Sequence, residues 1–229
     1  MTQADTSNSD PAPGRSRAAE RPLTLAVLIS GTGRTLENLL RVIAAGELAA
    51  RVAVVVSSVP NVRGLEIAAA AGLPHLVVRR RDAPSEDAYS AAIYAALAPF
   101  RPDLILLGGF LRKLVVPPAL AGRILNIHPA LLPESGAAGK GFFGERVHAA
   151  VLASGATESG ATVHVVDNDY DTGPVVLRAT VPVLSGDTPA TLGARVFAAE
   201  CALYPEAIRR HVAAHPELHG ATTSPWEHA

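Results

Sequence analysis

Cysteine is nearly missing from this sequence, and aromatic residues are scarce. Cys201 is the single cysteine among 229 residues, so an internal disulfide is excluded, and no cluster of cysteine and histidine has the spacing of a zinc site. Aromatic residues account for 4% of the chain, whereas hydrophobic residues account for 48%. This balance is typical of an α/β protein with aliphatic layers, and the lone thiol fits a reducing, cytoplasmic setting.

The sequence also lacks an excess of positive or negative charge, and it lacks long apolar runs. The net charge is −1, and no uncharged run reaches the roughly 18 residues that a transmembrane helix needs. We therefore expect neither a membrane nor a nucleic acid as partner. Residues 1–21 are polar and rich in proline, serine and alanine, which predicts a disordered extension, and residues 214–229 are expected to form a loose tail.

Short apolar runs alternate with helical patterns in the first half of the remaining chain. The apolar runs predict buried strands at residues 23–30, 51–58, 75–78, 102–110 and 122–128. Helical spacing predicts helices between them, at residues 36–45, 62–71 and 84–100. This alternation predicts a doubly wound, mostly parallel sheet with helices on both faces, which is a Rossmann-like α/β fold.

The pattern changes at Pro129. A glycine-rich loop that contains Lys140 is followed by a predicted helix at residues 145–154, strands at 160–166 and 174–183, and a last helix at about 188–212. We expect a single domain over residues 22–213, in which the α+β half 129–213 follows the doubly wound half 22–128.

The predicted strand that ends in "NIH" carries the most reactive side chains. Side chains alternate along a strand, so Asn126 and His128 should point to the same side. An amide and an imidazole placed in this way can stabilise an oxyanion together. The alternative is that the pair only caps backbone groups at the strand end.

Three further segments are candidates for binding. In "SGTGRTL", Gly31 and Gly33 lie between a strand and a helix, where free N–H groups suit a phosphate, although a tight turn without ligand explains them equally. The aspartates of "DNDYDTG" fit a cation site, a solvated turn or a catalytic loop. Glu200 falls at the edge of the apolar stripe of the last helix, where it either holds a polar ligand or reaches solvent.

Taken together, the motifs "LISGTGRTL", "NIHPALLP", "GATVHVVDNDYDTGPV" and "AECALYP" resemble the phosphoribosylglycinamide formyltransferases, a folate-dependent enzyme family of purine synthesis. The resemblance covers residues 23–212. It implies transfer of a formyl group from 10-formyltetrahydrofolate to the amine of glycinamide ribonucleotide, without a metal. The implied partners are these two small substrates, and the sequence leaves a homodimer open.

The resemblance also implies roles for particular residues. Asn126, His128 and Asp171 would form the catalytic trio, with Asn126 and His128 serving the oxyanion. The nucleotide would be held by Gly33, Arg34, Thr35 and Glu200. The folate pocket would be lined by Arg112, Lys113, Leu114, Asn126, Asp167, Asn168, Asp169, Tyr170 and Asp171.

One position departs from the family pattern in the folate pocket. The family often has an arginine that contacts folate in the segment matching "PSEDAY", where this chain has Glu86. The resemblance leaves this folate contact open for this chain, and Arg81 is a cation near it in sequence.

Two other functions stay open as alternatives. A formyltetrahydrofolate deformylase would use water in place of the amine, but it normally carries an additional N-terminal domain, whereas about 22 residues precede the first strand here. A non-catalytic module that binds nucleotide or folate is the second alternative.

Overall fold

The computed structural model describes residues 21–132, 144–218 and 226. The predicted N-terminal extension, apart from Arg21, lies outside the described residues. So do Lys140, most of the glycine-rich loop, and most of the C-terminal tail. Within the described residues, no helix is both long and apolar enough to cross a membrane.

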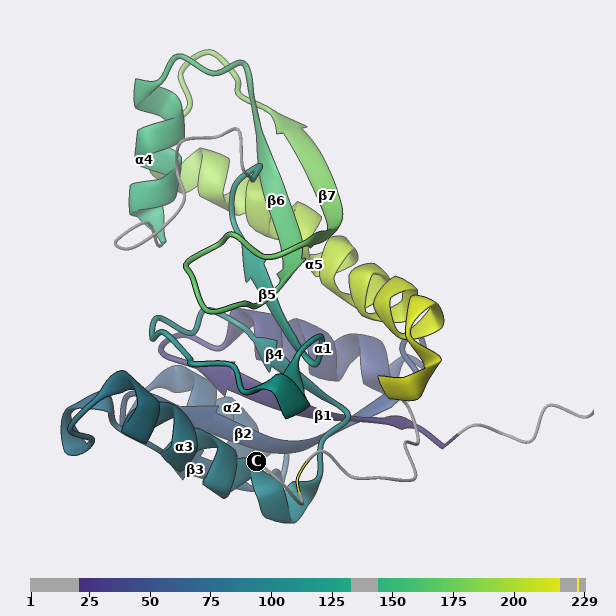
Figure 1. The fold of residues 1–229 in the computed structure, drawn as a ribbon. Helices are drawn as coiled ribbons and strands as arrows, with labels where there is room; N and C mark the ends of the chain where they lie inside the picture. The colour runs from purple at the N-terminus through teal and green to yellow at the C-terminus, as the bar shows by residue number, and fades with distance from the viewer. Residues whose placement is uncertain (1–20, 133–143, 219–225, 227–229) are drawn as a thin grey trace, which may run out of the picture.

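A single seven-stranded sheet forms the centre of the molecule, in the order β3-β2-β1-β4-β5-β6-β7 (Figure 1). The first five strands in this order pair in parallel, and β6 and β7 continue the sheet in antiparallel pairing. The strands are β1 (Leu23–Ile29), β2 (Ala50–Ser57), β3 (His75–Val77), β4 (Leu104–Leu107), β5 (Ile124–His128), β6 (Glu158–Val165) and β7 (Val175–Pro182).

Helices cover both faces of the sheet, because its strands are apolar on both sides. The longer helices are α1 (Arg34–Ala44), α2 (Arg63–Ala70), α3 (Glu86–Leu97), α4 (Glu145–Ala153) and α5 (Pro189–Ala214). One core joins the sheet to α1, α2, α4 and α5, and the second joins its other face to α3 and the segment that follows β4. The predicted doubly wound, mostly parallel fold with an α+β second half is confirmed.

The largest differences from the predicted bounds lie at the ends of two segments. The strand expected at 102–110 forms ladder pairs only over Leu104–Leu107, because the chain bends at Gly108 and Gly109, and Gly109 has a φ of +72°. The helix expected at 84–100 begins at Glu86, where Ser85 caps it by accepting a hydrogen bond from the Ala88 N–H.

Part of the predicted tail packs against the domain. Helix α5 continues to Ala214, and the Leu218 side chain beyond it is buried in the first core. Trp226 donates a hydrogen bond from its indole nitrogen to the Pro102 carbonyl, at 3.0 Å. Trp226 therefore lies near the amino end of β4, away from the carboxyl ends of the parallel strands.

Candidate active site

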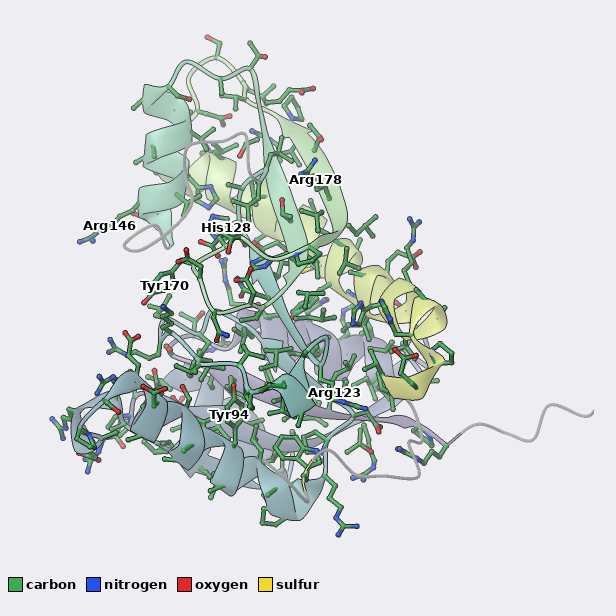
Figure 2. The ribbon with its side chains drawn as sticks, viewed as in Figure 1. Tyr94, Arg123, His128, Arg146, Tyr170 and Arg178 are labelled. Atoms are coloured by element: carbon green, nitrogen blue, oxygen red, sulfur yellow. The ribbon has the colours of Figure 1, made fainter. Side chains whose placement is uncertain are left out.

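A cavity of about 880 Å³ lies beyond the carboxyl ends of β1, β4 and β5. Strands β1 and β4 are neighbours, and the chain proceeds from them toward opposite edges of the sheet, which is where doubly wound sheets bind ligands. In Figure 2, His128 and Tyr170 lie at this level, between the parallel strands and the part that contains α4, β6 and β7. A volume of this size suits ligands larger than a single ion or metabolite fragment.

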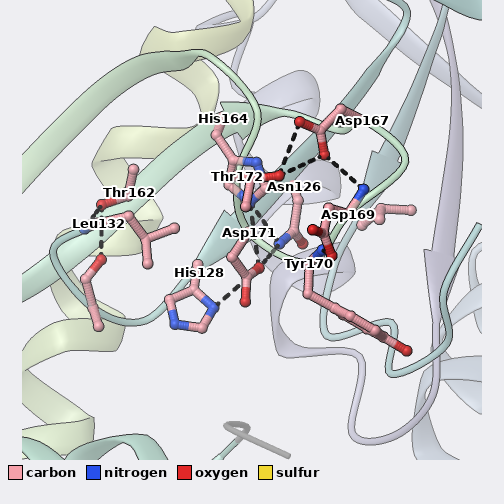
Figure 3. A network of polar contacts seen from close by, with 12 residues as sticks. Asn126, His128, Leu132, Thr162, His164, Asp167, Asp169, Tyr170, Asp171 and Thr172 are labelled. Atoms are coloured by element: carbon pink, nitrogen blue, oxygen red, sulfur yellow. Dashed lines mark hydrogen bonds and ion pairs between the residues drawn. The ribbon is translucent and has the colours of Figure 1, made fainter. Parts of the chain in front are cut away.

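Asp171 is the centre of a polar cluster at the base of this cavity (Figure 3). Its Oδ1 atom lies 3.5 Å from His128 Nδ1, 3.5 Å from His164 Nε2 and 3.5 Å from Asn126 Nδ2. Because β5 and β6 are antiparallel neighbours, Asn126 pairs with His164 across the ladder. The structure thus brings Asn126, His128 and Asp171 together, as expected from the sequence, and it adds His164 to them.

The Asn126 amide has one hydrogen that is well bound and one that is available. Its nitrogen lies 3.1 Å from His164 Nε2, and His164 Nδ1 lies 3.0 Å from the Val165 carbonyl. The imidazole therefore donates through Nδ1 and accepts the amide hydrogen at Nε2. The second amide hydrogen reaches only Asp171 Oδ1 at 3.5 Å, a weak contact that a ligand oxygen can replace.

The His128 ring is fixed between the strand and the Asp171 loop. Its Nδ1 atom faces the Asp171 carboxylate, so Nε2 is on the opposite side of the ring. A carboxylate beside one ring nitrogen favours the protonated imidazole and selects the tautomer. The arrangement allows His128 to donate a proton from Nε2 while Asp171 keeps the ring in place.

Asp171 itself adopts a left-handed backbone conformation, with a φ of +57°. Few residues other than glycine do so, and the conformation costs on the order of 1 kcal/mol. The loop is held by Thr172 and by the Asp169 backbone, which both donate to the Asp167 carboxylate. The unfavourable backbone conformation of this turn thus directs one carboxylate at Asn126, His128 and His164.

The glycine turn after β1 forms another part of the cavity wall. Gly33 precedes α1 with a φ of +73°, and a Cβ there would lie 2.5 Å from the Gly64 Cα atom. Helix α1 begins at Arg34, so the N–H groups of its first turn have no partner within the helix and suit an anion. Thr35 also borders the cavity and packs against Gly108.

Glu200 reaches the same region from α5 and lines the cavity. Burial raises the pKa of its carboxyl to about 7, while the nearby Arg34 guanidinium acts in the opposite direction. Glu200 can therefore bind a ligand either as an acid or as a carboxylate near neutral pH. Of the two interpretations open from the sequence, the structure places this side chain toward the cavity.

The expected folate segment lines the cavity with one exception. Arg112, Lys113 and Leu114 follow β4, and the Lys113 ammonium lies 5.7 Å from the centre of the Tyr170 ring. Asn168 does not line the cavity. Its side-chain oxygen instead accepts a hydrogen bond from the Val116 N–H at 2.7 Å, so it ties the aspartate loop to the segment after β4.

Several lining residues were not expected from the sequence. Arg80, and not Arg81, lines the cavity beside Glu86, while the Arg81 side chain is 75% exposed and faces Asp82. The 3₁₀ turn at Arg80–Asp82 decides which of the two adjacent arginines points inward, and charge pattern alone contains no signal for it.

His148 is a second residue that the sequence did not single out. It is 6% exposed, and its Nδ1 atom has no hydrogen-bond partner among the described residues. Burial lowers its pKa, as do the nearby Arg34 and His128. A Cβ at Gly193 would lie 2.8 Å from the His148 ring, so the small residue in α5 makes room for this imidazole.

The fold and the cluster define a class: a Rossmann-like α/β protein with an amide, two imidazoles and a carboxylate gathered beside its topological switch. The chain belongs to the formyl transferase family, which matches residues 23–208. The family resemblance expected from the motifs is thereby confirmed.

Three similar proteins illustrate this membership. A phosphoribosylglycinamide formyltransferase of Mycobacterium tuberculosis is 44% identical over 190 residues, which cover 82% of this chain and 84% of that protein. The crystal structure of glycinamide ribonucleotide transformylase 1 from Symbiobacterium toebii has a TM-score of 0.75 and 39% identity, covering 82% of this chain and 87% of that one.

The third relative is much longer than this chain. A trifunctional purine biosynthetic protein adenosine-3 of Drosophila pseudoobscura pseudoobscura is 41% identical over 188 residues, which are 80% of this chain. They are 13% of that protein, so the present chain corresponds to a small part of it.

Proposed function

We propose that the chain transfers the formyl group of 10-formyltetrahydrofolate to the amine of glycinamide ribonucleotide. The observation that carries the proposal is the cluster in which Asn126, His128 and His164 each lie 3.5 Å from one oxygen of Asp171, in a chain of the formyl transferase family. A cytoplasmic location is part of the proposal, and the single cysteine fits such a reducing setting.

The reaction asks for an oxyanion site and one proton transfer. The amine attacks the formyl carbon, and the carbonyl oxygen becomes a tetrahedral oxyanion. The second hydrogen of the Asn126 amide and the Nε2–H of a protonated His128 supply two donors for it. One such donor is worth about 2.7–4 kcal/mol in acyl transfer.

Collapse of the intermediate breaks the bond between carbon and the folate nitrogen. That nitrogen gains a proton and the attacking amine loses one, so no net proton is consumed. His128 suits this transfer because imidazole titrates near neutral pH. Asp171 favours the protonated ring and orients it, either directly or through a water that relays the proton.

The cavity separates two kinds of binding group. The turn at Gly33, Arg34 and Thr35, together with Glu200, would hold the nucleotide. Arg112, Lys113, Leu114 and the loop Asp167–Asp171 would hold the folate. These two walls meet at Asn126 and His128, which brings the reacting amine and formyl carbon to the donors.

A coupled assay tests the proposal. The protein is incubated with 10-formyltetrahydrofolate in the presence and absence of glycinamide ribonucleotide, and tetrahydrofolate, formate and formylated nucleotide are measured by absorbance and mass spectrometry. We expect tetrahydrofolate to appear only with the nucleotide, in equal amount to formylated product. Equal rates without nucleotide, with release of formate, would instead identify a deformylase, and binding of both ligands without turnover would leave a binding module.

A further inference from the structure

Helix α5 presents a second stripe of side chains to the cavity besides the apolar stripe that packs in the core. Gly193, Phe197 and Glu200 are spaced by four and three residues, so they share one side of the helix, and all three line the cavity. Phe197 is the one large apolar side chain in this stripe. Phe197 is half-buried and belongs to neither of the two apolar cores.

The partner of the ring is a cation from another helix. The Arg34 guanidinium carbon lies 4.0 Å from the centre of the Phe197 ring, which is the geometry of a cation–π contact. Arg34 is exposed and is the first residue of α1, directly after Gly33. Among the residues that the structure describes, no carboxylate forms an ion pair with it, although Glu200 is close enough to act on it electrostatically.

Stacking on the Phe197 ring restricts the conformations of the Arg34 side chain before a ligand binds. An arginine side chain loses much rotamer freedom when it binds an anion, and a flexible one would also turn toward the nearby Glu200. The ring removes this freedom before the ligand arrives while it leaves the edge N–H groups of the guanidinium available. Those N–H groups then act beside the free N–H groups of the first turn of α1.

We propose that Phe197 is a positioning residue, which holds the Arg34 guanidinium in place so that it binds the phosphate of the nucleotide substrate. The identity of that substrate rests on the proposed function, whereas the phosphate site itself does not. The chain thus builds its phosphate site from a charged residue in α1 and an aromatic support in α5, 163 positions later.

Binding of ribose 5-phosphate, measured by titration calorimetry, tests the proposal without the reaction. Phe197→Leu keeps the apolar volume but removes the π face, and we expect it to raise Kd about three- to tenfold. Phe197→Tyr keeps the ring and should restore Kd to within about twofold of the wild type. The same pattern should appear in the KM for glycinamide ribonucleotide, with kcat little changed.

A double-mutant cycle separates positioning from packing. In an Arg34→Met background, which has no cation to support, Phe197→Leu should leave Kd unchanged. An equal loss in both backgrounds would overturn the proposal, since the ring would then support the fold of the wall. So would an unchanged Kd in Phe197→Leu alone, or no binding of ribose 5-phosphate by the wild type.

The result also distinguishes this proposal from the proposed function. If the Kd pattern holds but no formyl transfer to glycinamide ribonucleotide occurs, the phosphate site and the role of Phe197 stand and the formyl transfer fails. If transfer occurs but the cycle shows no coupling between Arg34 and Phe197, the positioning role fails alone.

Discussion

The two ends of the sheet differ in how their strands are buried. Every residue of β1, at the centre of the parallel part, is buried, whereas Val181 is the one buried residue of β7, at the antiparallel edge. Parallel strands need helices on both faces, while an antiparallel edge can leave one face to solvent. The parallel half therefore contributes most of the core, and the antiparallel half contributes an outer wall.

The site lies where these two regions meet, and neither contains it alone. Asn126 and His128 come from β5, which pairs in parallel with β4. His164 and Asp171 come from β6 and the loop after it, on the antiparallel side. In the proposed mechanism, the buried half therefore supplies the two donors, and the exposed half supplies the groups that orient and charge them.

The largest effect should follow from removing the imidazole at the boundary. His128→Ala should lower kcat by about 100- to 10,000-fold, because the proton transfer and one oxyanion donor are lost. Steady-state kinetics with both substrates measures this, and circular dichroism checks the fold. His75→Ala, which removes an exposed imidazole on β3, is the matched control and should retain normal kcat.

Near-normal turnover in a folded His128→Ala variant would mean that the boundary is not the site of chemistry. A loss in Tm equal to that of a core variant would show instead that His128 acts mainly on stability.

The second prediction concerns Glu200 of α5, whose titration should make the free energy of unfolding depend on pH. Burial raises its pKa from about 4.5 to about 7 in the folded protein. Between these values the folded state binds more protons than the unfolded state, so the free energy of unfolding decreases as pH rises. The decrease attributable to Glu200 approaches about 3 kcal/mol above pH 7.

Glu200→Gln removes this titration. Its Tm relative to the wild type should increase as the pH is raised from 5 to 8 without ligand, with the exposed Glu66→Gln as control. A Tm difference that is constant over this range, or that changes in the opposite direction, would contradict the raised pKa of Glu200.

The same substitution in the two kinds of strand tests the comparison itself. Val27 in β1 is 0% exposed and Val175 in β7 is 41% exposed. Val27→Ala should cost roughly 2–3 kcal/mol of unfolding free energy, whereas Val175→Ala should cost under about 0.5 kcal/mol. Chemical denaturation measures both, and equal losses would show that the antiparallel edge is as important to stability as the parallel centre.

The fold could be predicted largely because its signals are local. Apolar runs marked every strand, and helical spacing marked all five long helices, since burial on both faces or on one stripe leaves a direct pattern in the sequence. The strand order is not local. Neither the position of β3 at one edge nor the antiparallel pairing of β5 with β6 follows from periodicity.

Less of the candidate site than of the fold could be predicted from the sequence. Alternation along β5 placed Asn126 and His128 on one side, but the positive φ of Asp171, which aims its carboxylate, has only a weak sequence signal, because aspartate adopts this conformation more often than most residues other than glycine but still seldom. Arg80 and Phe197 were missed because only the packed structure shows which side chains face the cavity. The catalytic and binding roles of the named residues stay predictions.

The most direct test of the boundary site is a double-mutant cycle of His128→Ala and Asp171→Asn, read as the single-turnover rate of formyl transfer. In the proposed mechanism Asp171 acts largely through the His128 ring, so we expect that the two losses do not multiply. We expect the double variant to be at most about tenfold slower than the slower single variant. Losses that multiply fully would show that the two residues act independently, and would contradict a site assembled from both halves of the sheet.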